Sequence, residues 1–326
     1  MQDSGKKFTL GIIGCGKIGF YNDYDKEVKG ALSHFNSFFQ SKRFSISCVA
    51  EIELKTREII KKKYSIPAYK EWKLLLERHS PEVVVVASTD ATHEEILTEV
   101  VKYRPKLVFC EKPLALSYKA AEWIIKEYEK LKIGLQVNYI RRFLKEHYEI
   151  KKLIEGDNLG RISSVLIYYS RGLIHNGTHY LDFVLWFFGF PEKIFRESQR
   201  RGLEDYDCTC SLLLTYKEGL EIRLVGLETS GLITNEIDII GSKGRIKIDY
   251  VEGSLKKYKI SQYSSNYHKF VLYETSEIDY GKALPLAADN IYKWLNGEEE
   301  LLSPANNNYG VYKMIEEIKE VELCQN

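Results

Sequence analysis

The first 137 residues alternate short apolar runs of strand length with amphipathic stretches of helix length, and no other feature of the sequence limits the possible folds as strongly. The apolar runs are rich in β-branched residues and cover 10–13, 46–50, 83–87, 107–110 and 133–137. Strands that are separated by helices form right-handed crossovers and lie parallel in one sheet. The alternation therefore predicts a doubly wound, parallel α/β domain over residues 1–137.

After residue 137, strand-like runs follow one another through glycine-containing turns, and few helical stretches separate them. These runs cover 161–170, 194–200, 208–216, 220–228, 236–240 and 245–250. The pattern predicts an α+β domain over residues 138–326, built on an open, mostly antiparallel sheet. Residues 178–188, THYLDFVLWFF, are apolar on nearly every side and predict a buried helix. From about residue 284 the pattern is helical again, which is compatible with these last helices packing back on the first domain.

Charge and hydropathy exclude two classes of partner. Lys and Arg total 47 and Asp and Glu total 46, so the formal net charge of +1 supplies no field that would attract nucleic acid or anionic lipid. No apolar run reaches the roughly 18 residues of a membrane span, and the first residues, MQDSGKKFTL, lack the apolar centre of a secretory signal. We therefore expect a cytoplasmic protein that binds neither nucleic acid nor membranes.

A glycine-rich loop follows the first predicted strand and has the pattern G-x-G-x-x-G. Gly14 would permit the turn, Gly16 would let the backbone approach a pyrophosphate, and Gly19 would allow close helix packing. An ordinary tight turn between a strand and a helix is the alternative that the pattern leaves open. Its position after the first strand favours a dinucleotide site formed by Gly14, Cys15, Gly16, Lys17, Ile18 and Gly19.

The second predicted strand ends at Glu51, where this fold places the carboxylate that binds the adenosine ribose hydroxyls. Glu51 lies 32 residues after Gly19, whereas the usual spacing is about 20. The excess falls in the polar stretch 20–35 and predicts an insertion at the start of the first helix. A solvated strand end is the alternative for Glu51, and Glu53 is the competing carboxylate. We predict NAD rather than NADP as the cofactor, because Glu51 would repel a 2′-phosphate.

Four further motifs follow in order: VVVVASTDATHEEI, LVFCEKPLALS, LQVNYIRRF and HNGTHYLDFVLWFFG. Together with the glycine loop they resemble the glucose-fructose oxidoreductase / inositol dehydrogenase / rhizopine catabolism family (Gfo/Idh/MocA). The resemblance covers nearly the whole chain, including IIGSKGRIKI in the second half. It implies an N-terminal Rossmann domain that binds a nicotinamide cofactor and a C-terminal sheet domain that binds a sugar-like substrate. The reaction that it implies is hydride transfer between nicotinamide and a secondary alcohol or ketone of a sugar, cyclitol or nucleotide sugar.

Glu111, Lys112 and Pro113 match the family's E-K-P motif, which implies that Lys112 reaches both the nicotinamide ribose and the substrate hydroxyl. Lys112 follows a predicted parallel strand, and ligands bind at the carboxyl ends of such strands. A surface lysine that caps the next helix is the alternative. The resemblance also implies a cofactor-binding loop after the preceding strand, although the family more often has Asn at the position of Asp90. The residues of this loop are Ser88, Thr89, Asp90 and His93, and for His93 a surface-loop histidine is the alternative.

The motif of the second half departs from the family's D-x-G-x-H-x-x-D pattern at its first position. His179 and Asp182 match the end of the pattern and Gly177 matches its glycine, but His175 stands in place of the first aspartate. The resemblance implies that His179 is the general base, with Lys112 polarising or relaying at the oxygen. We predict that His175 hydrogen-bonds a substrate hydroxyl, with a simple loop residue as the alternative. Asp182 is predicted to satisfy buried polar groups.

Substrate contacts are predicted for Lys112, Tyr139, Arg142, Asn176 and His179. Arg142 would meet a carboxylate or phosphate bidentately, with a salt bridge between the domains as the alternative. We predict no metal site, because the C-x-C pair Cys208 and Cys210 has no second Cys or His pair nearby. An open sheet with an apolar face usually needs a partner, so a homodimer or homotetramer through the open sheet is predicted.

Two other functions compete with a simple dehydrogenase. One is an NAD-dependent glycosidase-type enzyme of the same fold, which would release free sugar with no net NADH. The other is a non-catalytic sensor of nicotinamide dinucleotides, which would bind the cofactor without exchanging hydride with any sugar.

Overall fold

The computed structural model describes residues 7–27, 29–202, 206–228 and 233–321 of the chain. By compactness the chain divides into a first unit, 1–143 with 280–309, and a second unit, 144–279 with 310–326. The sequence placed this division at residue 137, where strand β6 (Gly134–Val137) ends. Among the described residues, no helix combines the length and the apolar character that crossing a membrane requires.

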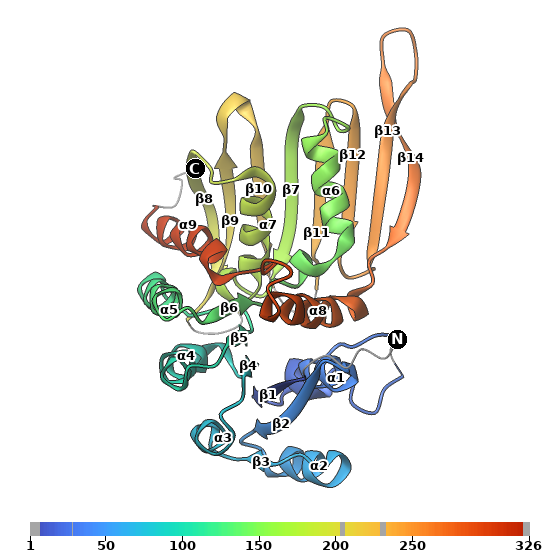
Figure 1. Ribbon diagram of the computed structural model, residues 1–326. Helices are drawn as coiled ribbons and strands as arrows, with labels where there is room; N and C mark the ends of the chain where they lie inside the picture. The colour runs from blue at the N-terminus through green and yellow to red at the C-terminus, as the bar shows by residue number, and fades with distance from the viewer. Residues whose placement is uncertain (1–6, 28, 203–205, 229–232, 322–326) are drawn as a thin grey trace. The chain divides into compact units, whose positions relative to one another are not determined.

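The first unit is built on a parallel six-stranded sheet with the order β3-β2-β1-β4-β5-β6 (Figure 1). Its other strands are β1 (Phe8–Ile13), β2 (Phe44–Ala50), β3 (Ala68–Tyr69), β4 (Val83–Val86) and β5 (Leu107–Cys110). Because both faces of the sheet are covered, the strands read as continuous apolar runs, and all four valines of β4 are fully buried. The predicted doubly wound domain is confirmed. The strand order reverses between β1 and β4, which is where sheets of this type bind ligands.

In the described part of this unit, six α-helices accompany the sheet: α1 (His34–Gln40), α2 (Leu54–Tyr64), α3 (Trp72–His79), α4 (His93–Val100), α5 (Tyr118–Lys130) and α8 (Ala283–Leu295). Helix α8 comes from the end of the chain and packs on α1 and β1, where the rings of Tyr292 and Phe8 are 5.9 Å apart. Its apolar face, with Leu284, Ala287 and Ile291, is buried in the same core as the first strands. The return of the chain to this unit therefore supplies part of its core.

The insertion predicted after the glycine loop separates two helical pieces. Lys17–Tyr21 form one short turn of helix, and α1 begins only at His34. Between them, the Asp23 carboxylate accepts hydrogen bonds from the backbone N–H groups of Leu32 (2.6 Å) and Ser33 (3.0 Å). The Ser33 hydroxyl in turn accepts from the Asn36 N–H and caps α1. These local hydrogen bonds explain how the long spacing to Glu51 is accommodated.

The second unit is built on an eight-stranded sheet with the order β14-β13-β12-β11-β7-β10-β9-β8, antiparallel except between β7 and β10. The strands are β7 (Ile162–Ser170), β8 (Lys193–Arg201), β9 (Cys208–Thr215), β10 (Glu221–Leu227), β11 (Glu236–Gly241), β12 (Gly244–Asp249), β13 (Ser254–Gln262) and β14 (His268–Glu277). The predicted open, mostly antiparallel sheet is confirmed. The hairpin of β13 and β14 extends it at one edge (Figure 1).

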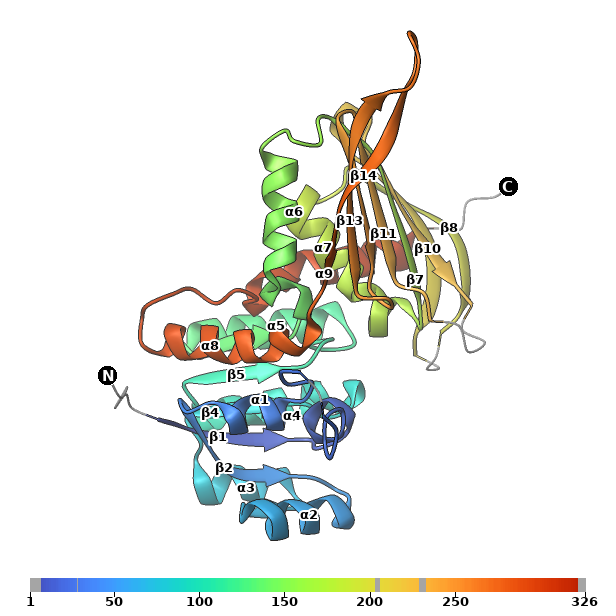
Figure 2. The same ribbon diagram turned by 90° about the vertical axis from the view of Figure 1, so that its right-hand side faces the viewer.

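One face of this sheet is covered by α6 (Lys145–Glu155), α7 (Thr178–Phe188) and α9 (Tyr309–Glu320), as Figure 2 shows. Inward side chains such as Ile237 and Ile239 are buried, whereas Asp238 between them points to the open face. The predicted buried helix is α7, and Gly189, with φ +77°, ends it. Asp182 lies buried within this helix, as predicted.

Candidate active site

The glycine loop has the geometry that close approach of a dinucleotide requires. Gly14 has a φ of +91°, and a Cβ there would lie 2.6 Å from the backbone of Ala87. A Cβ on Gly19 would lie 2.2 Å from the Gly14 carbonyl oxygen. At Gly16, by contrast, a Cβ would meet nothing within 4 Å. The loop is therefore tightly packed at its first and third glycines and open at the second, where the pyrophosphate of a dinucleotide would approach.

Glu51 is held beside this loop by backbone hydrogen bonds. One carboxylate oxygen accepts from the Cys15 N–H at 2.7 Å and the other from the Glu53 N–H at 3.0 Å. The Glu53 carboxylate is engaged elsewhere, because it accepts from the Thr56 hydroxyl at 2.6 Å. Burial and the nearby Glu51 carboxylate both raise the pKa of the Cys15 thiol far above its usual range, so the side chain of Cys15 stays neutral. This geometry favours Glu51 over Glu53 as the ribose-binding carboxylate.

The loop after β4 leads through the short turn Asp90–Thr92 into α4, and His93 connects it to the E-K-P segment. The His93 ring is fully buried, with Nδ1 2.7 Å from the Pro113 carbonyl oxygen and Nε2 3.2 Å from that of Ser88. A surface-loop histidine is therefore excluded. From this position His93 fixes the separation of two loops at the carboxyl ends of β4 and β5.

Glu111 belongs to a buried hydrogen-bond network directly beside Lys112. Its Oε1 atom accepts from the Asn138 side-chain amide at 2.6 Å and lies 2.7 Å from His34 Nε2. Burial raises the pKa of Glu111, but His34, Asn138 and the charge of Lys112 together hold it below its ordinary value. The carboxylate is therefore ionised at neutral pH. His34 was missed in the sequence because it lies at the end of the insertion, as the first residue of helix α1, far along the chain from Glu111.

We expect Glu111→Ala to lower the free energy of unfolding by about 3–5 kcal/mol, because it leaves two buried polar partners without their acceptor. Chemical denaturation measures this change. Glu122→Ala is the matched control, because Glu122 pairs with Lys126 on an exposed helix surface and its loss should leave the free energy of unfolding nearly unchanged. An equal loss in both variants would contradict the importance of the buried network.

The Glu111 carboxylate should also make the free energy of unfolding depend on pH in a definite direction. Because the pKa of Glu111 is lowered in the folded protein, its stabilising contribution is present above the ordinary pKa of glutamic acid. That contribution is lost as the pH falls through the lowered folded value. In Glu111→Ala, the free energy of unfolding should therefore fall less steeply at acid pH than in the unmodified protein.

Tyr139 and Arg142 follow β6, which is the neighbour of β5 in the sheet. The Asn138 N–H donates to the Cys110 carbonyl oxygen at 2.8 Å, and the Arg142 N–H donates to the Tyr139 carbonyl oxygen at 2.9 Å. Both side chains are buried in the first unit. The structure therefore places them, like Lys112, after the last strands of the parallel sheet, and the Lys112–Pro113 peptide bond there is cis.

His175 and His179 lie in consecutive turns of one helical segment in the second unit. His175 belongs to a wide turn, Leu173–Gly177, which runs directly into α7. Both histidines are half-buried. The Asn176 side-chain amide donates to the Ser170 carbonyl oxygen at 2.9 Å and to Asn235 Oδ1 at 3.0 Å, which fixes this turn against β7.

Asp207, which the sequence pattern did not indicate, anchors the turn that carries His175. Its buried carboxylate accepts from the backbone N–H groups of Ile174 and His175, each at 2.9 Å, and of Cys208 at 2.8 Å. A Cβ on Gly172 would lie 2.0 Å from Asp207 Oδ2, so the close approach requires glycine there. Asp207 thus positions the turn, in a chain whose motif has His175 instead of the family's aspartate.

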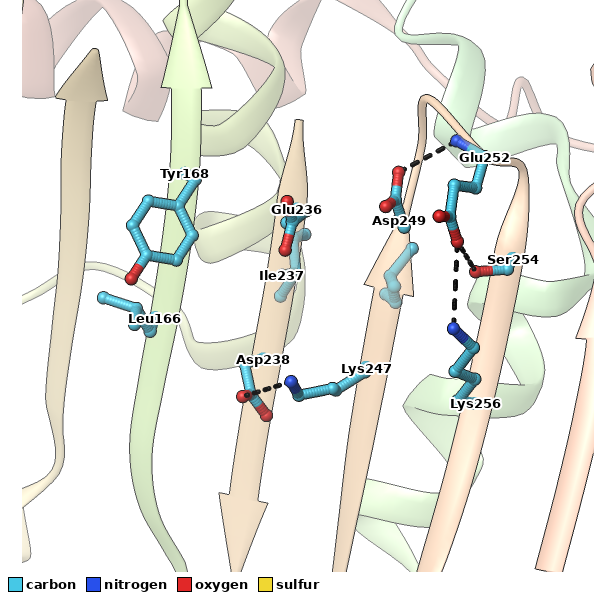
Figure 3. A pocket seen from close by; sticks show the side chains of 11 residues that line it. Leu166, Tyr168, Glu236, Ile237, Asp238, Lys247, Asp249, Glu252, Ser254 and Lys256 are labelled. Atoms are coloured by element: carbon cyan, nitrogen blue, oxygen red, sulfur yellow. Dashed lines mark hydrogen bonds and ion pairs between the residues drawn. The ribbon is translucent and has the colours of Figure 1, made fainter. Parts of the chain in front are cut away.

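A separate cavity of about 290 Å³ lies on the open face of the second sheet, over β7, β11, β12 and β13 (Figure 3). Its charged lining is largely paired within itself: Lys247 Nζ is 3.8 Å from Asp238, and Lys256 Nζ is 3.8 Å from Glu252. None of the predicted site residues lines this cavity. Among the described residues, no group of three or more His, Cys, Asp or Glu side chains is arranged to hold a metal ion.

Comparison with known proteins gives one family match and several relatives. The family described as "Oxidoreductase family, NAD-binding Rossmann fold" (GFO_IDH_MocA) matches residues 8–139. A myo-inositol 2-dehydrogenase of Thermotoga maritima is 27% identical over 265 residues, which cover 74% of this chain and 75% of that protein. An inositol 2-dehydrogenase of Rubrobacter xylanophilus is 25% identical over 161 residues, 49% of this chain and only 43% of that protein.

Solved structures share the fold over nearly the whole chain. The WlbA dehydrogenase from Bordetella pertussis, in complex with NADH and UDP-GlcNAcA, has a TM-score of 0.76 at 18% identity and covers 96% of this chain and 95% of its own. An oxidoreductase from Agrobacterium radiobacter, in complex with NAD+, L-tartaric acid and magnesium, has a TM-score of 0.73 at 15% identity and covers 97% of each chain. At these identities the similarity concerns the fold alone.

Proposed function

Because the chain belongs to the Gfo/Idh/MocA family of NAD-binding oxidoreductases, we propose that it transfers a hydride between NAD(H) and a secondary alcohol or ketone carbon of a cyclitol, sugar or nucleotide sugar. The observation that carries this proposal is the glycine loop, open at Gly16 and flanked by the Glu51 carboxylate, at the point where the strand order reverses. The first unit would bind the cofactor and the second the substrate.

The residues at the carboxyl ends of β1, β2, β4 and β5 fit a nicotinamide dinucleotide. The loop from Gly14 to Gly19 would bind the pyrophosphate, and Glu51 the adenosine ribose. The predicted remaining contacts come from Ser88, Thr89, Asp90, Glu111 and Lys112, with His93 holding the loops from within. When bound, the cofactor supplies the hydride acceptor for oxidation or the hydride donor for reduction.

The chain's own residues handle the proton and the orientation of the substrate. Oxidation of an alcohol removes a proton from its oxygen, and we assign this proton to His179 as general base. Lys112 would hydrogen-bond the same oxygen and stabilise the negative charge that develops on it. His175 would hydrogen-bond a neighbouring hydroxyl, held in place through the Asp207 carboxylate. Tyr139, Arg142 and Asn176 remain proposed substrate contacts.

The substrate class is supported by the two curated relatives described above, both of which are inositol 2-dehydrogenases. Steady-state assays with cyclitols, free sugars and nucleotide sugars would rank these substrates by kcat/KM. A nucleotide sugar with a higher kcat/KM than every cyclitol would show that the substrate class differs from that of the inositol dehydrogenases.

We also propose that the open face of the second sheet mediates self-association, because it carries partly buried apolar side chains such as Leu166 and Tyr168.

We expect NAD+ to bind at least about tenfold more tightly than NADP+, a difference of about 1.4 kcal/mol. The physical reason is repulsion between the Glu51 carboxylate and a 2′-phosphate. Isothermal titration of both cofactors measures the two Kd values. Glu51→Gln keeps an acceptor for the Cys15 N–H but removes the negative charge. The Kd values of NAD+ and NADP+ should therefore differ less in this variant than in the unmodified protein.

Glu53→Gln is the matched control for this prediction, because the Glu53 carboxylate accepts a hydrogen bond from the Thr56 hydroxyl, whereas the Glu51 carboxylate accepts one from the loop residue Cys15. This variant should bind NAD+ more tightly than NADP+ by the same factor as the unmodified protein. Equal binding of both cofactors by the unmodified protein would show that Glu51 does not face the ribose.

A further inference from the structure

Two cysteines of β9 place their sulfur atoms side by side. Cys208 and Cys210 are separated by one residue, so their side chains point to the same face of the strand. The two sulfur atoms are 3.4 Å apart. Cys210 is fully buried, whereas Cys208, the first residue of the strand, is half-buried. The pair therefore combines a reachable thiol with a buried neighbour.

The surroundings distinguish the two thiols chemically. The hydrogen bond from Cys210 is the largest effect on the Cys208 thiol and lowers its pKa, whereas burial and the Asp207 carboxylate raise it. The positive charges of Arg196 on β8 and Lys319 on α9 lower the pKa further, so that it lies below its ordinary value. The same hydrogen bond and burial raise the pKa of Cys210. The more exposed thiol is therefore also the one that more readily forms the nucleophilic thiolate.

This end of β9 also holds the turn that carries His175. Asp207 accepts from the His175 N–H, and the Thr209 hydroxyl accepts from the Gly172 N–H at 3.1 Å. The Tyr169 hydroxyl donates to the Cys210 carbonyl oxygen at 2.7 Å and accepts from the Cys210 N–H at 3.0 Å. A change in the backbone between residues 207 and 210 would therefore act on the segment 172–175.

We propose that Cys208 and Cys210 are a reversible redox site that a peroxide converts to a disulfide. The Cys208 thiolate attacks one oxygen of hydrogen peroxide, the O–O bond breaks, and hydroxide leaves as Cys208 becomes a sulfenic acid. The Cys210 sulfur then attacks Cys208, the S–O bond breaks, and water forms from the leaving oxygen and the available protons. The sulfur atoms lose two electrons in total and the peroxide gains them.

The strand geometry makes this disulfide strained and easily reduced. Residues two apart in a strand have Cα atoms about 6.5 Å apart, near the upper limit of about 6.8 Å for a disulfide. Closing the bond therefore draws residues 208 and 210 together and disturbs the first residues of β9. Strained disulfides of this kind are the labile ones.

Peptide mapping of the full-length protein tests the proposal. Trypsin releases residues 202–217 as one peptide that contains both cysteines. After brief treatment with hydrogen peroxide the protein is unfolded in denaturant and alkylated with iodoacetamide, so that every free thiol is labelled. This peptide should then be two hydrogen atoms lighter and unlabelled, and dithiothreitol before alkylation should restore double labelling. We expect the conversion to be at least about tenfold faster than oxidation of free glutathione. A peptide that stays doubly labelled when glutathione is oxidised would overturn the proposal.

Three variants separate the roles of the thiols. Cys210→Ser should accumulate a sulfenic acid at Cys208 that dimedone labels. Cys208→Ser should leave the Cys210 thiol unoxidised, so that iodoacetamide labels it once the protein is unfolded in denaturant. Cys48→Ser is the control, because Cys48 is buried in the first unit. In this variant the peptide 202–217 should be oxidised to the disulfide as fast as in the unmodified protein. Preferential oxidation of Cys210, or disulfides to other cysteines in place of the pair, would overturn the assignment.

Hydrogen exchange tests the link to the His175 turn without any assay of activity. Oxidation should raise the exchange rates of the Ile174 and His175 amides by about tenfold, because their acceptor Asp207 shifts with β9. Unchanged exchange in the fully oxidised protein would overturn this link.

Discussion

Replacing Lys112 with methionine is expected to lower kcat by about 10²-fold or more while leaving the Kd of NAD+ within about tenfold. Methionine keeps the apolar stem but removes the ammonium group that would stabilise the substrate oxygen. Lys112 follows β5 and adjoins the buried Glu111 network, so its backbone position is held independently of its charge. Steady-state kinetics with the best substrate, together with titration of NAD+, measures both quantities.

Lys119→Met is the control for this experiment, because Lys119 is exposed on α5 and has no predicted role. This variant should keep kcat within about twofold. A Lys112→Met enzyme with nearly full turnover would remove Lys112 from the mechanism, even though the fold would stand.

His179→Ala is expected to lower kcat by about 10²- to 10⁴-fold, the usual range for loss of a general base. Thermal unfolding should show that the variant is folded, since His179 is half-buried and its neighbours in α7 form the core. His179→Gln, which preserves size and polarity without a base, should be equally slow. Full activity in either variant would contradict the assignment of His179.

His175→Ala is the companion of this experiment and separates binding from chemistry. We expect it to raise KM about tenfold while kcat falls much less than in His179→Ala, because His175 is proposed to hold a hydroxyl. His175→Asp restores the residue that the family has at this position and should retain activity. An unchanged KM in His175→Ala would return His175 to a simple loop residue.

Much of the architecture follows from local sequence patterns. The β-branched runs and their helices predicted the parallel sheet, and α7 has the predicted bounds because its apolar residues end at Gly189. The short strand β3 and helix α6 were not predicted from the sequence. The hairpin of β13 and β14 was missed because apolar and polar residues do not alternate regularly along either strand.

Only some residues of the candidate site could be predicted from the sequence, for a different reason. The glycine loop and Glu51 are recognisable because they follow strands directly, at positions that the fold fixes. His34 and Asp207 are separated from their partners Glu111 and His175 by 77 and 32 residues, and only tertiary structure brings them together. No local pattern carries information about such contacts.

Nicotinamide absorbance reports whether this chain transfers hydride. The protein is incubated with NAD+ and a panel of cyclitols, sugars and nucleotide sugars, and with NADH and the matching ketones, while nicotinamide absorbance is followed beside the Lys112→Met variant. We expect stoichiometric formation or consumption of NADH with at least one compound of the panel, and a rate that is lower by about 10²-fold or more in the variant. Tight binding of NAD+ with no hydride transfer in either direction across the panel would contradict the claim and favour a sensor.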